Sequence, residues 1–105
     1  MIRLSVFYPN IEGKKFDKEY YLNTHMPLSL KLQGEAVKQV SVEFGVSSGM
    51  PGSKPAYLAI CNFLYDSFEA FEKAFMPHAE VLMKDIGNYT DIDTVVQFSE
   101  VVMSQ

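Results

Sequence analysis

The order in which two hydrophobic periods alternate along the chain constrains its fold most. Apolar side chains at every second position predict strands, and apolar side chains at helical spacing predict helices. The predicted elements are, in order, strand 2–8, helix 17–34, strand 37–46, strand 56–65, helix 66–87 and strand 94–103. Asp17 is the expected N-cap of the first helix, and Gly34 and Gly87 are the expected ends of the two helices.

The order β-α-β-β-α-β is typical of the ferredoxin-like split unit. We therefore expect an α+β fold in a single domain, residues 1–105, with an antiparallel four-stranded sheet and both helices on one face. The last two strands carry large apolar residues on both sides, such as Phe63 against Ile60. The sheet face without helices would then be apolar, so we expect a homodimer that packs sheet against sheet.

Composition and charge exclude several classes of protein. The formal net charge is −4, and Lys14 and Lys15 form the only adjacent basic pair, which argues against nucleic acid or an anionic membrane as a partner. The sole cysteine permits no internal disulfide, and no apolar run approaches the ~20 residues of a membrane span. We expect a cytoplasmic protein.

The first helical segment holds the main candidate for chemistry. At 100° per residue, its inward side is shared by Tyr21, His25, Leu28 and Leu32. Pro27 cannot donate a hydrogen bond to the carbonyl of Asn23, so we expect the helix to bend beside His25. A bend beside a buried imidazole would leave space between helix and sheet.

His25 has two interpretations. In a site, it would act as a general acid or base, or would hydrogen-bond a substrate oxygen without transferring a proton. A single inward histidine is also typical of a core residue whose imidazole binds a backbone carbonyl.

Other polar or titratable residues carry weaker signals. His78 lies at the edge of the apolar stripe of the second helix, where a histidine at the rim is the plain interpretation. Tyr57 and Tyr65 could project hydroxyls into a cleft or simply pack in the core. Asn62 interrupts an apolar strand and could line a site, whereas Cys61 is expected to be structural.

The sequence holds no recognisable metal or cofactor motif. Its two histidines are far apart, its single cysteine has no partner, and no glycine-rich phosphate loop or GxSxG elbow is present. We therefore expect no metal and no cofactor.

Three stretches resemble the EthD family, named from bacterial ether degradation. They are FDKEYYLNTHMPL (16–28), DSFEAFEKAF (66–75) and DIGNYTDIDTVVQFSEV (85–101). The similarity runs from about residue 3 to residue 102. It implies a dimeric α+β barrel, a superfamily that includes cofactor-free monooxygenases of aromatic polyketide-like substrates, lactone isomerases and haem-linked enzymes. By position, it implies a cleft lined by His25 with Tyr21, Met26, Leu28, Asp85, Asn88 and Thr90.

We therefore expect a homodimer with a small pocket for an apolar or aromatic ligand between the first helix and the sheet. His25 would move a proton next to a carbonyl or phenol, as in a cofactor-independent, monooxygenase-like oxidoreductase. Three alternatives remain open: a non-catalytic binding module, an isomerase or lyase of the same fold, and a haem-handling protein with a histidine ligand.

Overall fold

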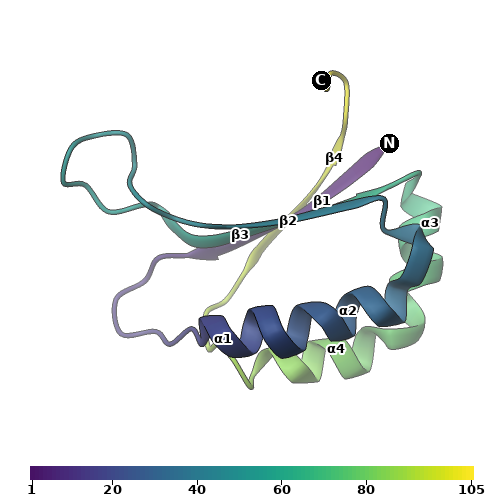
Figure 1. Ribbon diagram of the computed structural model, residues 1–105, viewed down its shortest axis with the longest axis horizontal. Coiled ribbons are helices and arrows are strands. Elements are labelled where there is room, and N and C mark those ends of the chain that lie inside the picture. Colours follow the sequence, from purple (N-terminus) through teal and green to yellow (C-terminus); the bar gives the residue numbers. More distant parts are fainter.

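The computed structural model describes residues 1–105 as a four-stranded antiparallel sheet, in the order β2-β3-β1-β4, with helices on one face (Figure 1). The elements are β1 (Ile2–Pro9), α1 (Lys18–Tyr20), η1 (Tyr21–His25), α2 (Met26–Gln33), η2 (Gly34–Ala36), β2 (Gln39–Phe44), β3 (Tyr57–Tyr65), α3 (Phe68–Phe75), η3 (Met76–His78), α4 (Ala79–Ile86) and β4 (Val95–Glu100). The predicted α+β, ferredoxin-like fold is confirmed. No helix is long and apolar enough to span a membrane.

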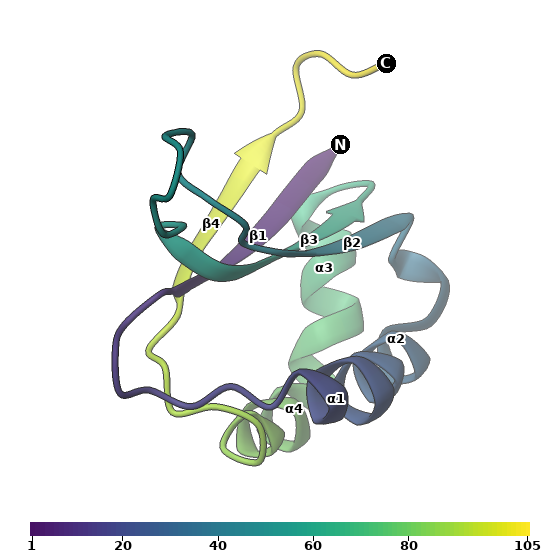
Figure 2. The same ribbon diagram turned by 60° about the vertical axis from the view of Figure 1, so that its left-hand side comes forward.

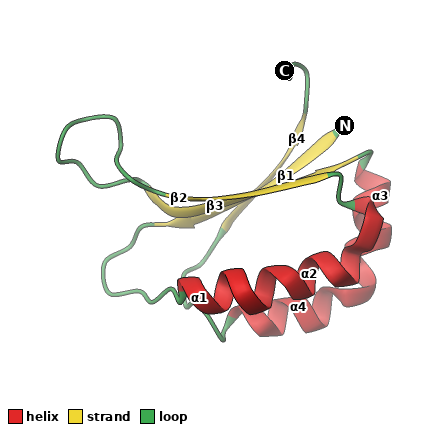
Figure 3. Cartoon of the chain, viewed as in Figure 1, coloured by secondary structure: helices red, strands yellow, loops and turns green.

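The strand register separates the two faces of the sheet. Leu4 of β1 lies opposite Phe63 of β3 and Phe98 of β4, so all three side chains share the face that the helices cover. Figure 3 shows all the helices below this face and none above it. The buried core, which includes Leu4 and Phe63, lies between these two layers.

The first helical segment contains a π-helical turn, η1, where the sequence predicted a bend. Asp17 caps the segment as predicted, because its carboxylate accepts a hydrogen bond from the amide of Tyr20 at 3.0 Å. The amide of Met26 then donates to the carbonyl of Tyr21, five residues back, so this turn is wider than an α-helical one. Pro27 follows directly in the first turn of α2, where it donates no backbone hydrogen bond to the turn before it.

The wide turn changes which side chains face the sheet. It holds one extra residue, so each later residue points where its predecessor would point in an unbroken α-helix. The buried inward row is therefore Tyr21, His25, Ser29 and Gln33, together with Met26. The prediction that Leu28 and Leu32 face inward is wrong, since both are only half-buried.

The second helical segment consists of two helices, not the single helix that the sequence predicted. Ser67 caps α3, with its hydroxyl accepting a hydrogen bond from the amide of Ala70 at 3.1 Å. The 3₁₀ turn η3 contains Pro77 and separates α3 from α4. Figures 1 and 2 show that the two helices run in different directions, and that α4 lies alongside α2.

The outer face of the sheet is less apolar than predicted. Phe7, Ile60 and Val95 meet there in adjacent strands, and the side chain of Val95 is 52% exposed. Ser5 and Asn62 also lie on this face, and the Ser5 hydroxyl donates to Asn62 Oδ1 at 2.6 Å. The apolar side chains of this face are therefore interrupted by a polar pair, with Leu64, opposite Arg3 and Gln39, on the far side of it.

Gly45 is required where β2 leaves the sheet. A Cβ atom there would lie 2.2 Å from the Tyr57 carbonyl oxygen and 2.6 Å from Pro55 Cβ. We expect Gly45→Ala to lower the free energy of unfolding by about 1–3 kcal/mol, measured by urea denaturation, because backbone must move to admit the methyl group.

Gly87→Ala is the matched control for this prediction. The nearest atom to a Cβ at Gly87 is the Lys84 carbonyl oxygen at 3.9 Å, an ordinary contact. The control should change the free energy of unfolding by less than about 0.5 kcal/mol. Equal effects of the two substitutions would contradict the crowding at Gly45.

Candidate functional site

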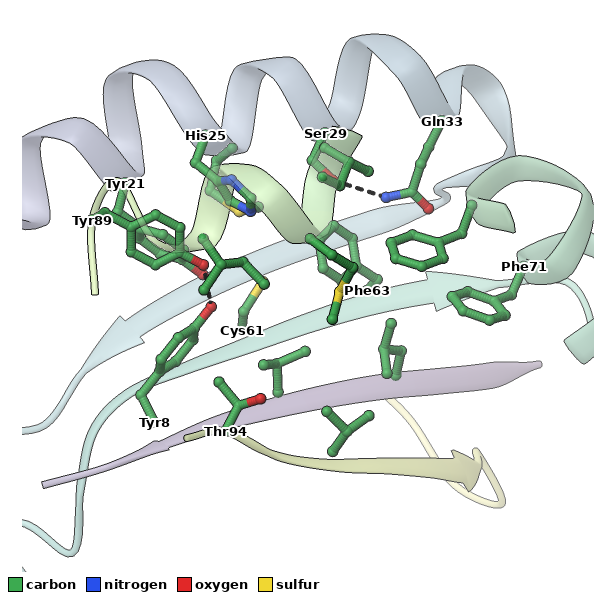
Figure 4. Close-up of a pocket in the computed structure, with 18 of the residues that line it drawn as sticks. Tyr8, Tyr21, His25, Ser29, Gln33, Cys61, Phe63, Phe71, Tyr89 and Thr94 are labelled. Carbon is green, nitrogen blue, oxygen red and sulfur yellow. Dashed lines mark hydrogen bonds between the residues drawn. The ribbon is translucent and has the colours of Figure 1, made fainter. Parts of the chain in front are cut away.

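A cavity of about 260 Å³ lies between the helices and the sheet (Figure 4). Its lining comprises 19 residues, of which 15 are hydrophobic. The four polar residues that line it are His25, Ser29, Gln33 and Thr94. An apolar enclosure with a few polar groups is the usual form of a small-molecule site.

His25 is the only titratable group among these four, and a carboxylate holds its ring. The imidazole Nδ1 lies 2.9 Å from Oδ2 of Asp85, which α4 supplies. The Tyr20 hydroxyl donates to Asp85 Oδ1 at 2.6 Å, and the Asn88 amide donates to the same oxygen at 3.0 Å. Figure 4 shows the ring pointing from the helix into the cavity.

The state of Asp85 fixes the tautomer of His25. Burial of the carboxyl raises its pKa, but hydrogen bonds from Tyr20, Asn88 and His25 outweigh burial and hold the pKa below its usual value. Asp85 is therefore ionised at neutral pH and can only accept hydrogen bonds. His25 must carry a hydrogen on Nδ1, and the lone pair of the neutral ring is then on Nε2.

Three buried tyrosines form a cluster beside the imidazole. The ring centroid of His25 lies 4.7 Å from that of Tyr89 and 5.9 Å from that of Tyr21, and the two tyrosine rings are themselves 4.9 Å apart. The hydroxyls of Tyr89 and Tyr8 lie 2.7 Å apart. Burial raises the pKa of all three phenols, so they remain protonated at neutral pH. One hydroxyl of the Tyr8–Tyr89 pair donates to the other, so the hydrogen of the second hydroxyl is not used within the pair.

A second polar group lies farther along the helix. The Tyr65 hydroxyl donates to Gln33 Oε1 at 2.5 Å, and Gln33 Nε2 donates to Ser29 Oγ at 2.9 Å. In Figure 4, Ser29 and Gln33 lie on the side of the cavity toward Phe71, whereas Tyr8, Tyr21 and Tyr89 lie toward the other end.

The structure places only part of the predicted site at the cavity. Tyr21, His25 and Met26 line it. Asp85 does not line it but is the hydrogen-bonding partner of His25, and Asn88 in turn donates a hydrogen bond to Asp85.

Two predicted residues lie near the cavity without lining it. Tyr65 is buried beside it, with its hydroxyl on Gln33. The Thr90 hydroxyl donates to the Lys15 carbonyl at 2.6 Å, which anchors the chain before α1.

The other predicted site residues lie elsewhere. Leu28 is turned aside by η1, and His78 is at the bend between α3 and α4; neither lines the cavity. Asn62 is on the outer face of the sheet. The register shift after Tyr8 brings the ring of Tyr57 to 5.0 Å from that of Phe7, which also belongs to the outer face.

Sequence reasoning missed Ser29, Gln33 and the Tyr8–Tyr89 pair. Ser29 and Gln33 follow Tyr21 and His25 at a constant spacing of four residues, and Pro27 was the only sign that the helix would turn them inward. Tyr8 was predicted on the same side of its strand as Leu4, but nothing in the sequence pairs it with a tyrosine 81 positions away.

Cys61 is buried in the wall of the cavity. Burial raises the pKa of the Cys61 thiol to about 12, so the thiol stays protonated. No three His, Cys, Asp or Glu side chains are grouped so that they could hold a metal ion.

Comparison with known proteins places the chain in a family. The EthD domain model matches residues 12–93. An EthD-like protein from Ralstonia eutropha JMP134 superposes with a TM-score of 0.93 at 41% sequence identity, covering 99% of this chain and 94% of that one. No curated protein shows significant similarity to the chain.

More distant structures share the fold. An EthD-family protein from Bacillus halodurans C-125 gives a TM-score of 0.69 at 23% identity, covering 97% of this chain and 99% of that one. A dimeric protein of ferredoxin-like fold from Bacteroides fragilis NCTC 9343 gives 0.57 at 9% identity, with 95% of each chain covered.

The hydrogen bonds to Asp85 predict a pH dependence of stability. Its pKa is lower in the folded than in the unfolded chain, where it is about 4, so its contribution is complete above that pH and is lost as the pH falls through the folded pKa. We expect Asp85→Asn to lose less unfolding free energy than wild type between about pH 5 and about pH 2 in urea titrations.

Asp93→Asn is the control for this measurement. Asp93 is an exposed carboxylate without a side-chain hydrogen bond, so its replacement should leave the wild-type slope intact. A slope in Asp85→Asn as steep as that of wild type would contradict the role of the network around Asp85.

Proposed function

The chain belongs to the EthD domain family, and we propose that it binds a small apolar molecule bearing oxygen, aromatic or carbonyl, and moves a proton on that molecule through His25. The cavity supports the ligand class, because its walls are mostly aromatic and aliphatic and its polar groups are few.

The observation that carries this proposal is the bond between His25 and Asp85. A buried imidazole that merely filled space would need only one hydrogen-bond acceptor, such as a backbone carbonyl. Here an ionised carboxylate holds Nδ1 at 2.9 Å, and the ring lines the cavity. This arrangement leaves Nε2 as the nitrogen that can act as a base, and it stabilises the imidazolium that forms when the base takes a proton.

The Tyr8–Tyr89 pair can stabilise the negative charge that such a reaction creates. Removing a proton from a phenol, or from carbon next to a carbonyl, leaves negative charge on the ligand oxygen. The Tyr8–Tyr89 pair retains one hydroxyl hydrogen after its internal bond, and both residues line the cavity. That hydrogen can bond the oxyanion in a site with little water, where a preorganised donor is most effective.

Oxidation of the bound phenol by dioxygen is the first candidate reaction. A deprotonated phenol carries electron density on ring carbon, and that carbon can bond to dioxygen. The resulting peroxide loses water to leave a second carbonyl, so that phenol and dioxygen give quinone and water. His25 returns its proton to the departing oxygen. Without dioxygen, the same proton transfer would isomerise a ketone through its enol.

A homodimer formed through the outer sheet face is part of the proposal. Phe7, Ile60 and Val95 offer an apolar cluster there, and a standard interface buries roughly 800 Å² on each partner. The structural relatives from Bacteroides fragilis and from an uncultured marine organism are described as dimeric, and both share the ferredoxin-like fold.

His25→Gln should abolish proton transfer. In D₂O, wild type should exchange hydrogen for deuterium next to the carbonyl of aromatic ketones, followed by NMR. His25→Gln should slow this exchange by about 10²–10⁴-fold, since glutamine keeps the volume but supplies no base. Oxygen uptake with phenols, measured on the same pair, reports whether oxidation follows.

The other histidine gives a matched control. His78→Gln removes an imidazole that does not line the cavity, so it should exchange and oxidise like wild type. Equal exchange by wild type and His25→Gln would refute the role of His25. Ligand binding without exchange in wild type would favour a binding module.

The dimer is tested by light scattering after size-exclusion chromatography. Wild type should elute at twice the chain mass of 11.9 kDa, and Ile60→Lys should elute as a monomer, because the lysine would be buried unpaired in the interface. Val81→Lys, a change at an exposed apolar residue of α4, should remain dimeric. A monomeric wild type at about 10 µM, well above a typical dissociation constant of such dimers, would contradict the interface.

A further inference from the structure

The cavity contains two polar side chains whose hydrogen-bond donors are not all used. Ser29 and Gln33 both line it, and they are only 4% and 6% exposed. A glutamine amide has two N–H donors and a serine hydroxyl has one O–H donor. The bonds to Tyr65 and within the pair occupy Gln33 Oε1, one N–H of Gln33 and one lone pair of Ser29.

Tyr65 fixes the orientation of this group. Burial raises the pKa of the Tyr65 phenol, so the hydroxyl is protonated at neutral pH and donates. It donates to Gln33 Oε1, which turns Nε2 toward Ser29. One N–H of Gln33 and the O–H of Ser29 remain as donors, on side chains that line the cavity.

Folding alone does not account for all the donors of this pair, although Gln33 also serves as the partner of the buried Tyr65 hydroxyl. Leu28, Leu30 and Leu32 belong to the same helix, so leucine suits its local structure. A buried amide or hydroxyl is unfavourable unless it is hydrogen-bonded, whereas a leucine facing an apolar cavity carries no such cost. The pair is therefore better explained by an acceptor inside the cavity than by packing.

We propose that Ser29 and Gln33 bind a carbonyl oxygen of the ligand. This inference rests on the proposed function, because the ligand occupies the same cavity. Ser29 follows His25 by one helical turn and Gln33 by two, about 6 Å and about 12 Å along the axis at 1.5 Å per residue. The ligand class is thus an elongated, largely apolar molecule with a phenol or enol at His25 and a carbonyl at the other end.

The charge of the cavity selects a neutral carbonyl over a carboxylate. No lysine or arginine lines it, and the donors of Ser29 and Gln33 are uncharged. A carboxylate or phosphate buried there would lack a counter-charge and would pay a large desolvation penalty. A ketone, quinone or lactone oxygen needs only one or two neutral donors.

Two probes that differ by one carbonyl test the proposal. They are 6-hydroxy-1-tetralone and 5,6,7,8-tetrahydro-2-naphthol, both bicyclic phenols, with 6-hydroxy-2-naphthoate as the carboxylate counterpart. Affinities are measured by isothermal titration calorimetry slightly below neutral pH, where both phenols stay protonated. Wild type should bind the ketone about five- to tenfold tighter than the naphthol, as expected for one or two net hydrogen bonds, and should disfavour the carboxylate.

Ser29→Ala should remove most of the preference for the ketone and leave the affinity for the naphthol unchanged. Gln33→Leu alone would leave the Tyr65 hydroxyl unpartnered, so the second variant is Gln33→Leu with Tyr65→Phe, which replaces both polar partners and should give the same result. Thr94→Val removes the remaining neutral polar group of the lining and should keep the full ketone preference.

Three results would overturn the proposal. They are equal or absent binding of ketone and naphthol in wild type, an unchanged preference in Ser29→Ala, and loss of the preference in Thr94→Val instead. His25→Gln separates this inference from the proposed function. If His25→Gln abolishes deuterium exchange while Ser29→Ala keeps the ketone preference, the carbonyl site at Ser29 and Gln33 is refuted and the role of His25 stands. If His25→Gln leaves exchange intact while Ser29→Ala loses the preference, the role of His25 is refuted and the carbonyl site stands.

Discussion

The extra residue in the turn Tyr21–His25 is the feature on which the site depends. In an uninterrupted α-helix, the inward residues after His25 would be Leu28 and Leu32 in place of Ser29 and Gln33. The π turn moves the following residues back by one position, which aims Ser29 and Gln33 at the sheet and leaves the leucines at the sides. Such a turn costs some helix stability, and π turns are frequently found at functional sites.

A second proline completes the site from the other helical segment. Pro77 lies in the 3₁₀ turn after α3, and the chain leaves that turn in a new direction as α4, beside the first segment (Figures 1 and 3). Only this course brings Asp85 to His25, 60 positions earlier in the sequence. The two prolines therefore have complementary roles. Pro27 follows the turn that orients His25, and Pro77 lies in the turn that directs α4, with Asp85, toward His25.

The sequence predicted what depends on local periodicity and failed where distant segments meet. Strand alternation and helical spacing gave the element order, and from it the sheet and the helix-covered face. The inward position of His25 also followed from spacing. Leu28 was wrongly placed because a wheel of 100° per residue assumes an unbroken helix. Tyr57 was misplaced because the register shift after Tyr8 is a tertiary feature, and the Tyr8–Tyr89 pair is a long-range contact with no local signal. Asp85 was identified by family resemblance, but its contact with His25 was not.

The imidazole of His25 has its two nitrogens in different surroundings. Nε2 belongs to the apolar side, whereas Nδ1 is linked through Asp85 to Tyr20 and to Asn88, a residue exposed at the surface. Charge gained at one nitrogen is balanced by the carboxylate at the other. The group that compensates this charge is thus fastened from the solvent side, by Tyr20 and Asn88, and takes up no room among the apolar walls.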